Sequence, residues 1–130
     1  MDLKENLIQM REIFSGAEGI NYAYLFGSAL KRMLPDSDID ILVNGDLDFD
    51  QRTHLAMKLT LRLKRNIDII LAKEASCELV LNALSQGLPI LVKSRYFVEQ
   101  DYFKNYMLYD ANTSLRRIRF ERIKKKYSND

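Results

Sequence analysis

Two aspartates at the head of a short apolar run constrain the fold of this chain more than any other feature. Residues 38–43 read Asp-Ile-Asp-Ile-Leu-Val. Because successive side chains of a strand point to opposite faces, Asp38 and Asp40 share one face, and the isoleucines and the valine share the other. Two carboxylates held side by side repel each other unless a proton or a cation lies between them. The pattern therefore predicts a half-buried strand that begins at a divalent-metal site.

A glycine-serine pair, Gly27-Ser28, ends the preceding apolar run at residues 20–26. A glycine lets the backbone approach a ligand closely. Ser28 would offer a hydroxyl and a backbone N–H at the start of a short helix that we expect over residues 28–33, and a helix start favours anions. A metal site beside an anion-binding turn predicts phosphoryl chemistry.

A third aspartate interrupts another short apolar run, which reads Asn-Ile-Asp-Ile-Ile-Leu-Ala over residues 66–72. A charged side chain in such a strand needs a partner or a task, because burying it unpaired is costly. If this strand lies beside residues 38–43, Asp68 completes a cluster of three carboxylates. The alternative is a purely structural ion pair with Arg62 or Arg65.

The Gly-Ser pair, the Asp-x-Asp pair and the later aspartate resemble, in order and spacing, the motif of the minimal nucleotidyltransferases of the polymerase-beta-like superfamily. Residues 79–92 are similar to the helix, turn and strand that close the core of the antitoxin-type members, which are partners of HEPN toxins. The resemblance implies an α/β (α+β) fold like the polymerase-beta palm, with helices packed on a small mixed sheet.

The resemblance also implies a function and a set of site residues. Three aspartates would be catalytic and would hold Mg²⁺: Asp38, Asp40 and Asp68. Three residues of the turn would bind the nucleotide: Gly27, Ser28 and Lys31. The protein would transfer AMP from ATP to a hydroxyl, on a tyrosine of a partner HEPN toxin, and so act as an antitoxin within a hetero-oligomer.

The turn departs from the antitoxin pattern in one respect. In that group Gly-Ser is followed by any residue and then by Ala-Arg-Gly, whereas here Lys31 takes the place of the arginine and Arg32 that of the glycine. Lysine does not reproduce the bidentate phosphate contacts of arginine. Two alternatives therefore stay open: a non-catalytic antitoxin-like binding module of the same fold, and a small-molecule nucleotidyltransferase of the aminoglycoside-modifying type.

Hydrophobic periodicity predicts an alternation of helices and strands. We expect helices over about residues 2–14, 50–65, 76–86 and 98–126, and strands over residues 20–26, 38–43, 67–72 and 88–92. The strand at 20–26 is apolar on both faces and should be central, whereas Pro89 favours an edge position for the last strand. Asp50 should cap the second long helix, whose core candidates are Leu55, Leu59, Leu61 and Leu63, and the C-terminal helix should break near residues 110–112.

Length and composition favour one domain over residues 1–130, because 47% of the residues are hydrophobic. The single cysteine, Cys77, excludes an internal disulfide, and we expect it to be buried. The N-terminus has no signal-peptide pattern, and no apolar run approaches the about 20 residues that span a bilayer. We therefore expect a cytoplasmic protein that makes no membrane contact.

The net charge of +2 hides a basic C-terminal segment. Residues 111–130 carry seven bases and two acids, and Leu115, Ile118 and Ile123 form an apolar stripe among them. Such a segment is usually a solvated helix face, although it can also dock an acidic partner or RNA. A nucleic-acid substrate is not expected, because 130 residues leave little room for the extra helical domain that end addition would need.

Overall fold

The computed structural model describes residues 3–27, 30 and 38–127. The described part of the chain contains eight helices and strands: α1 (Leu3–Ser15), β1 (Ile20–Phe26), β2 (Ile39–Gly45), α2 (Phe49–Leu63), β3 (Ile67–Leu71), α3 (Cys77–Gln86), β4 (Leu88–Val92) and α4 (Arg95–Tyr127). The predicted strands and the four predicted long helices occur in the predicted order. The predicted short helix over residues 28–33 falls almost entirely outside the described residues.

The four strands form one mixed sheet in the order β3-β2-β1-β4. Strand β1 pairs antiparallel with both β2 and β4, and β2 pairs parallel with β3. The central position predicted for β1 is therefore confirmed, as is the edge position of β4, where Pro89 lacks an N–H for a further ladder. The other edge is β3, the strand that carries Asp68.

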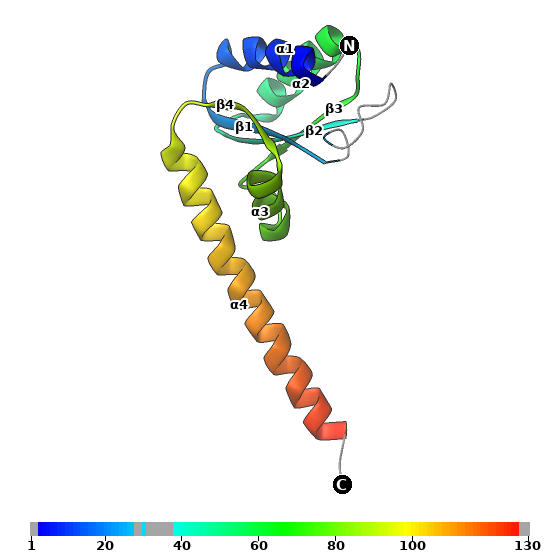
Figure 1. Cartoon of the computed structure of the whole chain (residues 1–130), viewed down its shortest axis with the longest axis vertical. Helices are drawn as coiled ribbons and strands as arrows, with labels where there is room; N and C mark the ends of the chain where they lie inside the picture. Colours follow the sequence, from blue (N-terminus) through cyan, green and yellow to red (C-terminus); the bar gives the residue numbers. More distant parts are fainter. Residues whose placement is uncertain (1–2, 28–29, 31–37, 128–130) are drawn as a thin grey trace.

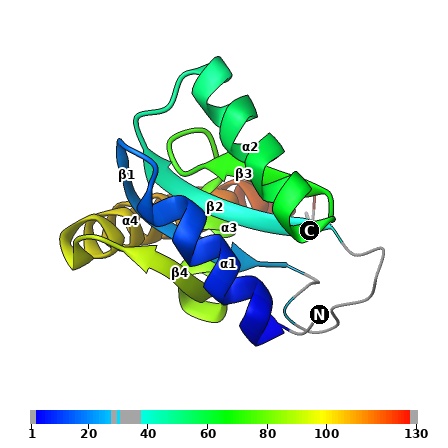
Figure 2. The same ribbon diagram turned by 90° about the horizontal axis from the view of Figure 1, so that it is seen from above.

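Helices cover both faces of this sheet (Figures 1 and 2). Helices α1 and α2 lie on one face and enclose the larger core, which includes the odd-numbered residues of β2: Ile39, Ile41 and Val43. Helix α3 and the first part of α4 lie on the other face, over a smaller cluster made by Tyr22, Leu42, Val80 and Ala83. Asp40 belongs to the even-numbered residues of β2, so it projects on the α3 side of the sheet.

The start of α2 corrects one prediction. Its N-cap is Asp48, whose Oδ1 accepts a hydrogen bond of 2.7 Å from the backbone N–H of Gln51, while Gln51 Oε1 accepts one of 2.9 Å from the backbone N–H of Asp48. This reciprocal pair is a capping box. Asp50, the predicted cap, lies in the first helical turn instead, where its negative charge interacts favourably with the helix dipole.

Two burial predictions are wrong. Leu61 was expected in the core and is 76% exposed, because Leu59 and Leu63 on either side of it occupy the buried face of α2. Cys77 was expected to be buried and is only partly so, because it is the first residue of α3.

Helix α4 is continuous over 33 residues, and the predicted break near residues 110–112 does not occur. The segment contains neither glycine nor proline, so nothing in it forces the helix to end. Asp101 anchors α4 to the sheet: its Oδ2 accepts hydrogen bonds from Tyr22 Oη at 2.7 Å and from Asn44 Nδ2 at 2.6 Å. Figure 1 shows that the helix then runs past α3 and away from the sheet. None of the helices in the described ranges is long and apolar enough to cross a membrane.

Candidate active site

Three chain segments meet at one end of the sheet. Because β1 is antiparallel to β2 and β2 is parallel to β3, the last residue of β1 lies beside the first residues of β2 and β3. The register places Phe26, Asp40 and Asp68 in one row across the three strands. A backbone hydrogen bond of 2.9 Å from the N–H of Ile39 to the carbonyl oxygen of Asn66 fixes the start of the β2–β3 ladder. The structure thus brings Asp40 and Asp68 together on the same face.

The electrostatics of Asp40 reflect this crowding. Burial raises the pKa of its carboxyl above the ordinary range, and the charges of Asp68 and Asp38 raise it further. Asp38 and Asp68 are themselves exposed. Asp40 is therefore repelled by two neighbouring carboxylates at the head of β2, and any positive charge placed among the three would relieve this repulsion.

Gly27 is in close contact with this group. Its φ is +88°, in the region that side chains other than glycine rarely adopt. A β-carbon added at Gly27 would lie 2.6 Å from Asp40 Oδ2, which is too close for any real contact. The carbonyl oxygen of Gly27 accepts a hydrogen bond of 3.2 Å from the N–H of Leu30, so the chain turns directly after the strand. The other two predicted nucleotide-binding residues, Ser28 and Lys31, lie outside the described residues.

The donor set at this end of the sheet fits a hard divalent cation. Asp38, Asp40 and Asp68 offer only oxygen ligands, which Mg²⁺ prefers. Within the described ranges, however, no three acidic, histidine or cysteine side chains are already arranged to enclose an ion. This is compatible with Mg²⁺, which keeps several waters and is usually held by one or two carboxylates together with the phosphates of a substrate.

The row behind the acids is apolar. Tyr24, Leu42 and Ile70 are the next register partners inward along the same face, and they belong to or border the cluster under α3. Phe26 borders the same cluster and lies directly opposite Asp40. The sequence singled out the acids but not Phe26, although its place one residue before Gly27 could have indicated it. An apolar neighbour of this kind lowers the hydration of the carboxylate beside it, consistent with the raised pKa of Asp40.

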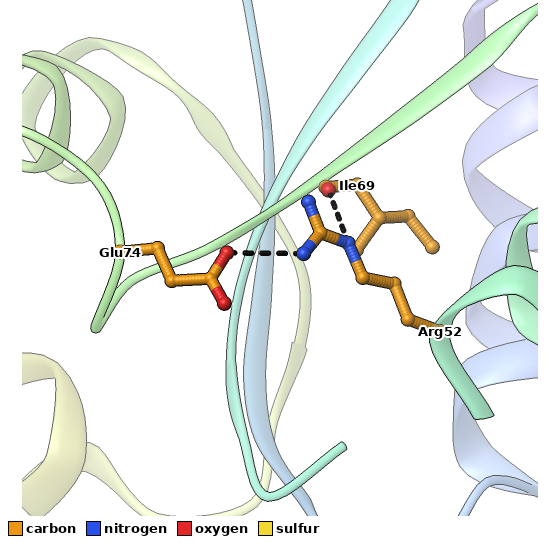
Figure 3. Close-up of polar contacts among 3 residues, drawn as sticks. All are labelled: Arg52, Ile69 and Glu74. Carbon is orange, nitrogen blue, oxygen red and sulfur yellow. Dashed lines mark hydrogen bonds and ion pairs between the residues drawn. The ribbon is translucent and has the colours of Figure 1, made fainter. Parts of the chain in front are cut away.

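Arg52 on α2 positions the strand that carries Asp68, and nothing in the sequence indicated this role. Its Nε donates a hydrogen bond of 3.1 Å to the carbonyl oxygen of Ile69, and its Nη1 donates one of 3.0 Å to Glu74 Oε2 (Figure 3). The guanidinium therefore caps the outer edge of β3. The proposed structural pairing of Asp68 with Arg62 is not seen, because Arg62 pairs with Glu12 at 2.8 Å.

Residues 9–96 match the family model described as "Polymerase beta, Nucleotidyltransferase". The chain belongs to this nucleotidyltransferase family. The matched region contains Gly27 and all three aspartates of the site, and it stops at the first turn of α4. No match to this chain was found among curated proteins.

Solved structures share the fold of this nucleotidyltransferase over almost its whole length. A chain of the toxin–antitoxin MntA–HepT crystal structure has a TM-score of 0.70 at 22% identity, covering 94% of this chain and 99% of that chain. A chain of a toxin–antitoxin structure with AMP-PNP has a TM-score of 0.71 at 23% identity, covering 95% and 100%. A chain of the tri-AMPylated Shewanella oneidensis HEPN toxin in complex with MNT antitoxin has a TM-score of 0.68 at 23% identity, covering 94% and 98%. The similarity includes α4, which lies beyond the family match.

Proposed function

We propose that this nucleotidyltransferase transfers AMP from ATP to a hydroxyl group of a partner protein, a HEPN-type toxin, and so acts as its antitoxin. The observation that carries the proposal is the pairing of Asp40 with Asp68 in register, beside the close approach of Gly27. The kinds of complex found among the similar structures support the choice of substrates, since one is a complex with AMP-PNP and another contains a tri-AMPylated HEPN toxin.

The residues of the site have distinct roles in the proposed reaction. Asp38 and Asp40 would hold Mg²⁺, which when bound would supply positive charge against the phosphates of ATP. Gly27 leaves room for the phosphates next to Asp40, and Ser28 and Lys31 bind them from the turn. Asp68 either shares in binding the metal or serves as the base.

The proposed step forms one bond to phosphorus and breaks another. The acceptor oxygen, from a tyrosine hydroxyl, forms a bond to the α-phosphorus of ATP. The bond from that phosphorus to the bridging oxygen breaks, and pyrophosphate leaves with the bonding electrons. In the role of base, Asp68 would take the proton of the hydroxyl, since it is exposed on an edge strand where an acceptor can reach it.

Labelled ATP distinguishes this proposal from its alternatives. The chain is incubated with Mg²⁺, labelled ATP and a small all-helical HEPN-type protein that carries an Arg-x4-His motif, to be sought in the gene adjacent to its own. We expect label and a mass shift on a tyrosine of that protein. Asp38→Ala or Asp40→Ala should abolish both, whereas Asp50→Ala should not, because Asp50 is an exposed acid on the first turn of α2, away from the site.

Two other outcomes would replace the proposal. Neutralisation of the toxin that survives Asp40→Ala and needs no ATP would indicate the non-catalytic binding module, which the changed turn at Lys31 and Arg32 leaves open. Transfer of label to an aminoglycoside instead of the protein would indicate a small-molecule nucleotidyltransferase. The proposed reaction uses ATP and Mg²⁺, which the cytoplasm supplies, and we place the protein there.

A further inference from the structure

Helix α4 is longer than the domain that it packs on. Its contacts with α3 include one from Arg116, whose Nη2 lies 3.9 Å from Glu78 Oε1 in the first turn of α3. All side chains of residues 117–126 are exposed, and Figure 1 shows this part of the helix projecting away from the sheet. Helices in proteins owe most of their stability to the burial of an apolar face. The projecting part of α4 gains no such burial from its own domain.

The first half of α4 also turns an apolar stripe to the solvent. Phe103 is 66% exposed, and three further exposed side chains complete the set that we call the outer stripe: Tyr96, Phe103, Tyr106 and Met107. Their spacing of seven, three and one residues places them on one side of the helix. Asp101, which is anchored to Tyr22, lies on the opposite side. The outer stripe therefore faces away from the sheet.

The projecting half combines positive charge with further apolar side chains. Residues 116–126 carry seven bases and a single acid, Glu121. Leu115, Ile118, Phe120 and Ile123 are all exposed among these bases. The partner of such a surface needs negative charge and an apolar groove together.

We propose that α4 is the docking arm of this protein and binds an acidic face of the partner protein. This inference rests on the proposed function, because the partner is the acceptor of AMP. A 33-residue helix is about 50 Å long at roughly 1.5 Å per residue. One side of it is long enough to bury the approximately 800 Å² per partner that a stable interface needs.

Two other occupants fit the surface less well. Single-stranded nucleic acid is bound where aromatic side chains stack on the bases beside positive charge. The aromatic side chains of the outer stripe lie between Tyr96 and Tyr106, outside the basic segment, and Phe120 is the one aromatic side chain that the structure describes within residues 115–126. A second copy of this chain would bring two strongly basic segments together in a parallel pair. In an antiparallel pair, each basic segment would meet residues 95–106, which carry two bases and two acids and offer no net attraction.

Charge reversal tests the docking arm. The double variant Arg119→Glu, Arg122→Glu is compared with Lys58→Glu, Lys73→Glu, which changes the net charge equally on exposed positions away from α4. Affinity for the HEPN-type protein is measured at about 50 and about 300 mM salt. We expect the α4 variant to bind at least about tenfold more weakly at low salt and to lose most of the salt dependence, while the control stays within about twofold of wild type.

A second measurement does not depend on substitutions. In the free protein, backbone amides of residues 115–126 should exchange with deuterium rapidly, and partner binding should slow them markedly. Unchanged exchange in the complex, or equal affinity of the α4 variant and wild type, would overturn the docking arm. Two other results would also overturn the docking arm. One is tighter binding of RNA than of the protein partner by this helix, and the other is a wild-type dimer that dissociates in the α4 variant.

The two proposals fail in different ways. Asp40→Asn should abolish AMP transfer and leave affinity for the partner within about twofold, since the site lies at the sheet and not on α4. The α4 charge reversal should weaken partner modification and leave ATP binding unchanged. Binding through α4 without any AMP transfer by the wild type would overturn the proposed function and leave the docking arm intact.

Discussion

The backbone of Gly27 and the carboxylate of Asp40 are in direct contact, since a β-carbon at Gly27 would lie 2.6 Å from Asp40 Oδ2. The positive φ of Gly27 and the position of the carboxylate are therefore coupled. A side chain at this position would have to displace either the turn or the acid. The proposed metal and phosphate sites thus depend on the backbone conformation that this glycine allows.

Gly27→Ala should consequently damage the site more than the fold. We expect unfolding free energy to fall by about 1–2 kcal/mol, because alanine disfavours this backbone conformation. AMP transfer should fall by about 100-fold, because Asp40 is pushed from its place. Urea unfolding and a labelled-ATP assay measure the two effects. Gly16→Ala is the control, since a β-carbon there would meet only ordinary contacts, the nearest being 3.7 Å from the carbonyl oxygen of Ile13.

Asp40 should make stability depend on pH in an identifiable direction. Its pKa is raised above the ordinary value of 3.8, so the folded protein keeps this proton to a higher pH than the unfolded chain does. The stabilising contribution is complete below pH 3.8 and is lost as pH rises through the raised pKa. Relative to Asp40→Asn, the wild type should therefore lose stability in urea unfolding as the pH rises from 3.8 through the raised pKa. A difference that stays constant with pH would contradict the crowding of the three acids.

Added Mg²⁺ should reverse this loss. At neutral pH the ion binds the folded wild type and raises its thermal unfolding midpoint. Asp40→Asn removes a ligand and should abolish most of the increase, whereas Asp50→Asn should retain it. An equal Mg²⁺ effect in the wild type and Asp40→Asn would show that the ion binds elsewhere.

Arg52→Ala should destabilise the strand that carries Asp68. The substitution leaves the carbonyl oxygen of Ile69 without its hydrogen bond from Arg52, and we expect a loss of about 1 kcal/mol. Arg62→Ala removes an ion pair between side chains that are each at least half exposed, and it should change stability by less than about 0.5 kcal/mol. Hydrogen exchange along β3, compared between the two variants, also tests whether the loss is local. Equal effects of the two substitutions would argue against a positioning role for Arg52.

Tyr22 should make the fold sensitive to alkali. Burial, and then its hydrogen bond to the Asp101 carboxylate, raise the pKa of this phenol above the ordinary value of 10.0. Above pH 10 the unfolded chain releases the proton that the folded protein keeps, so stability falls as pH rises, by at most ~1.4 kcal/mol per pH unit. Tyr22→Phe should remove this slope, measured by denaturant unfolding above pH 10. Tyr96→Phe, at an exposed position of α4, should keep it.

The sequence predicted the strands well because their pattern is local. The run of β1, which is apolar on both faces, and the apolar run after Asp38 reflect burial in the sheet, and each is visible within a few residues. The proximity of Asp40 to Asp68 followed once their two strands were assumed to be neighbours, since a parallel register aligns them.

The capping residue of α2 illustrates a signal that was present and misread. Both Asp48 and Asp50 can cap a helix, but only Asp48 has a glutamine three residues later. That spacing allows the reciprocal capping box seen between Asp48 and Gln51. Polar residues near Asn112 likewise indicated a break in α4, although a helix tolerates them where no glycine or proline follows.

The contacts of Arg52 could not be predicted from the sequence. Ile69 and Glu74 lie 17 and 22 residues away, on or just after another strand, and no periodic pattern links an arginine on α2 to a backbone carbonyl there. Such contacts depend on how helices settle on the sheet. The anchoring of Asp101 to Tyr22, 79 residues apart, was not foreseen for the same reason.

The two principal acids differ in how firmly the sheet secures them. Asp40 lies on β2, which is paired on both sides, whereas Asp68 lies on β3, which has a neighbour on one side only. Fraying of that outer strand would withdraw one carboxylate while the other stays in place. On warming, we expect activity to vanish some degrees before the protein melts, and to return on cooling without any need to refold.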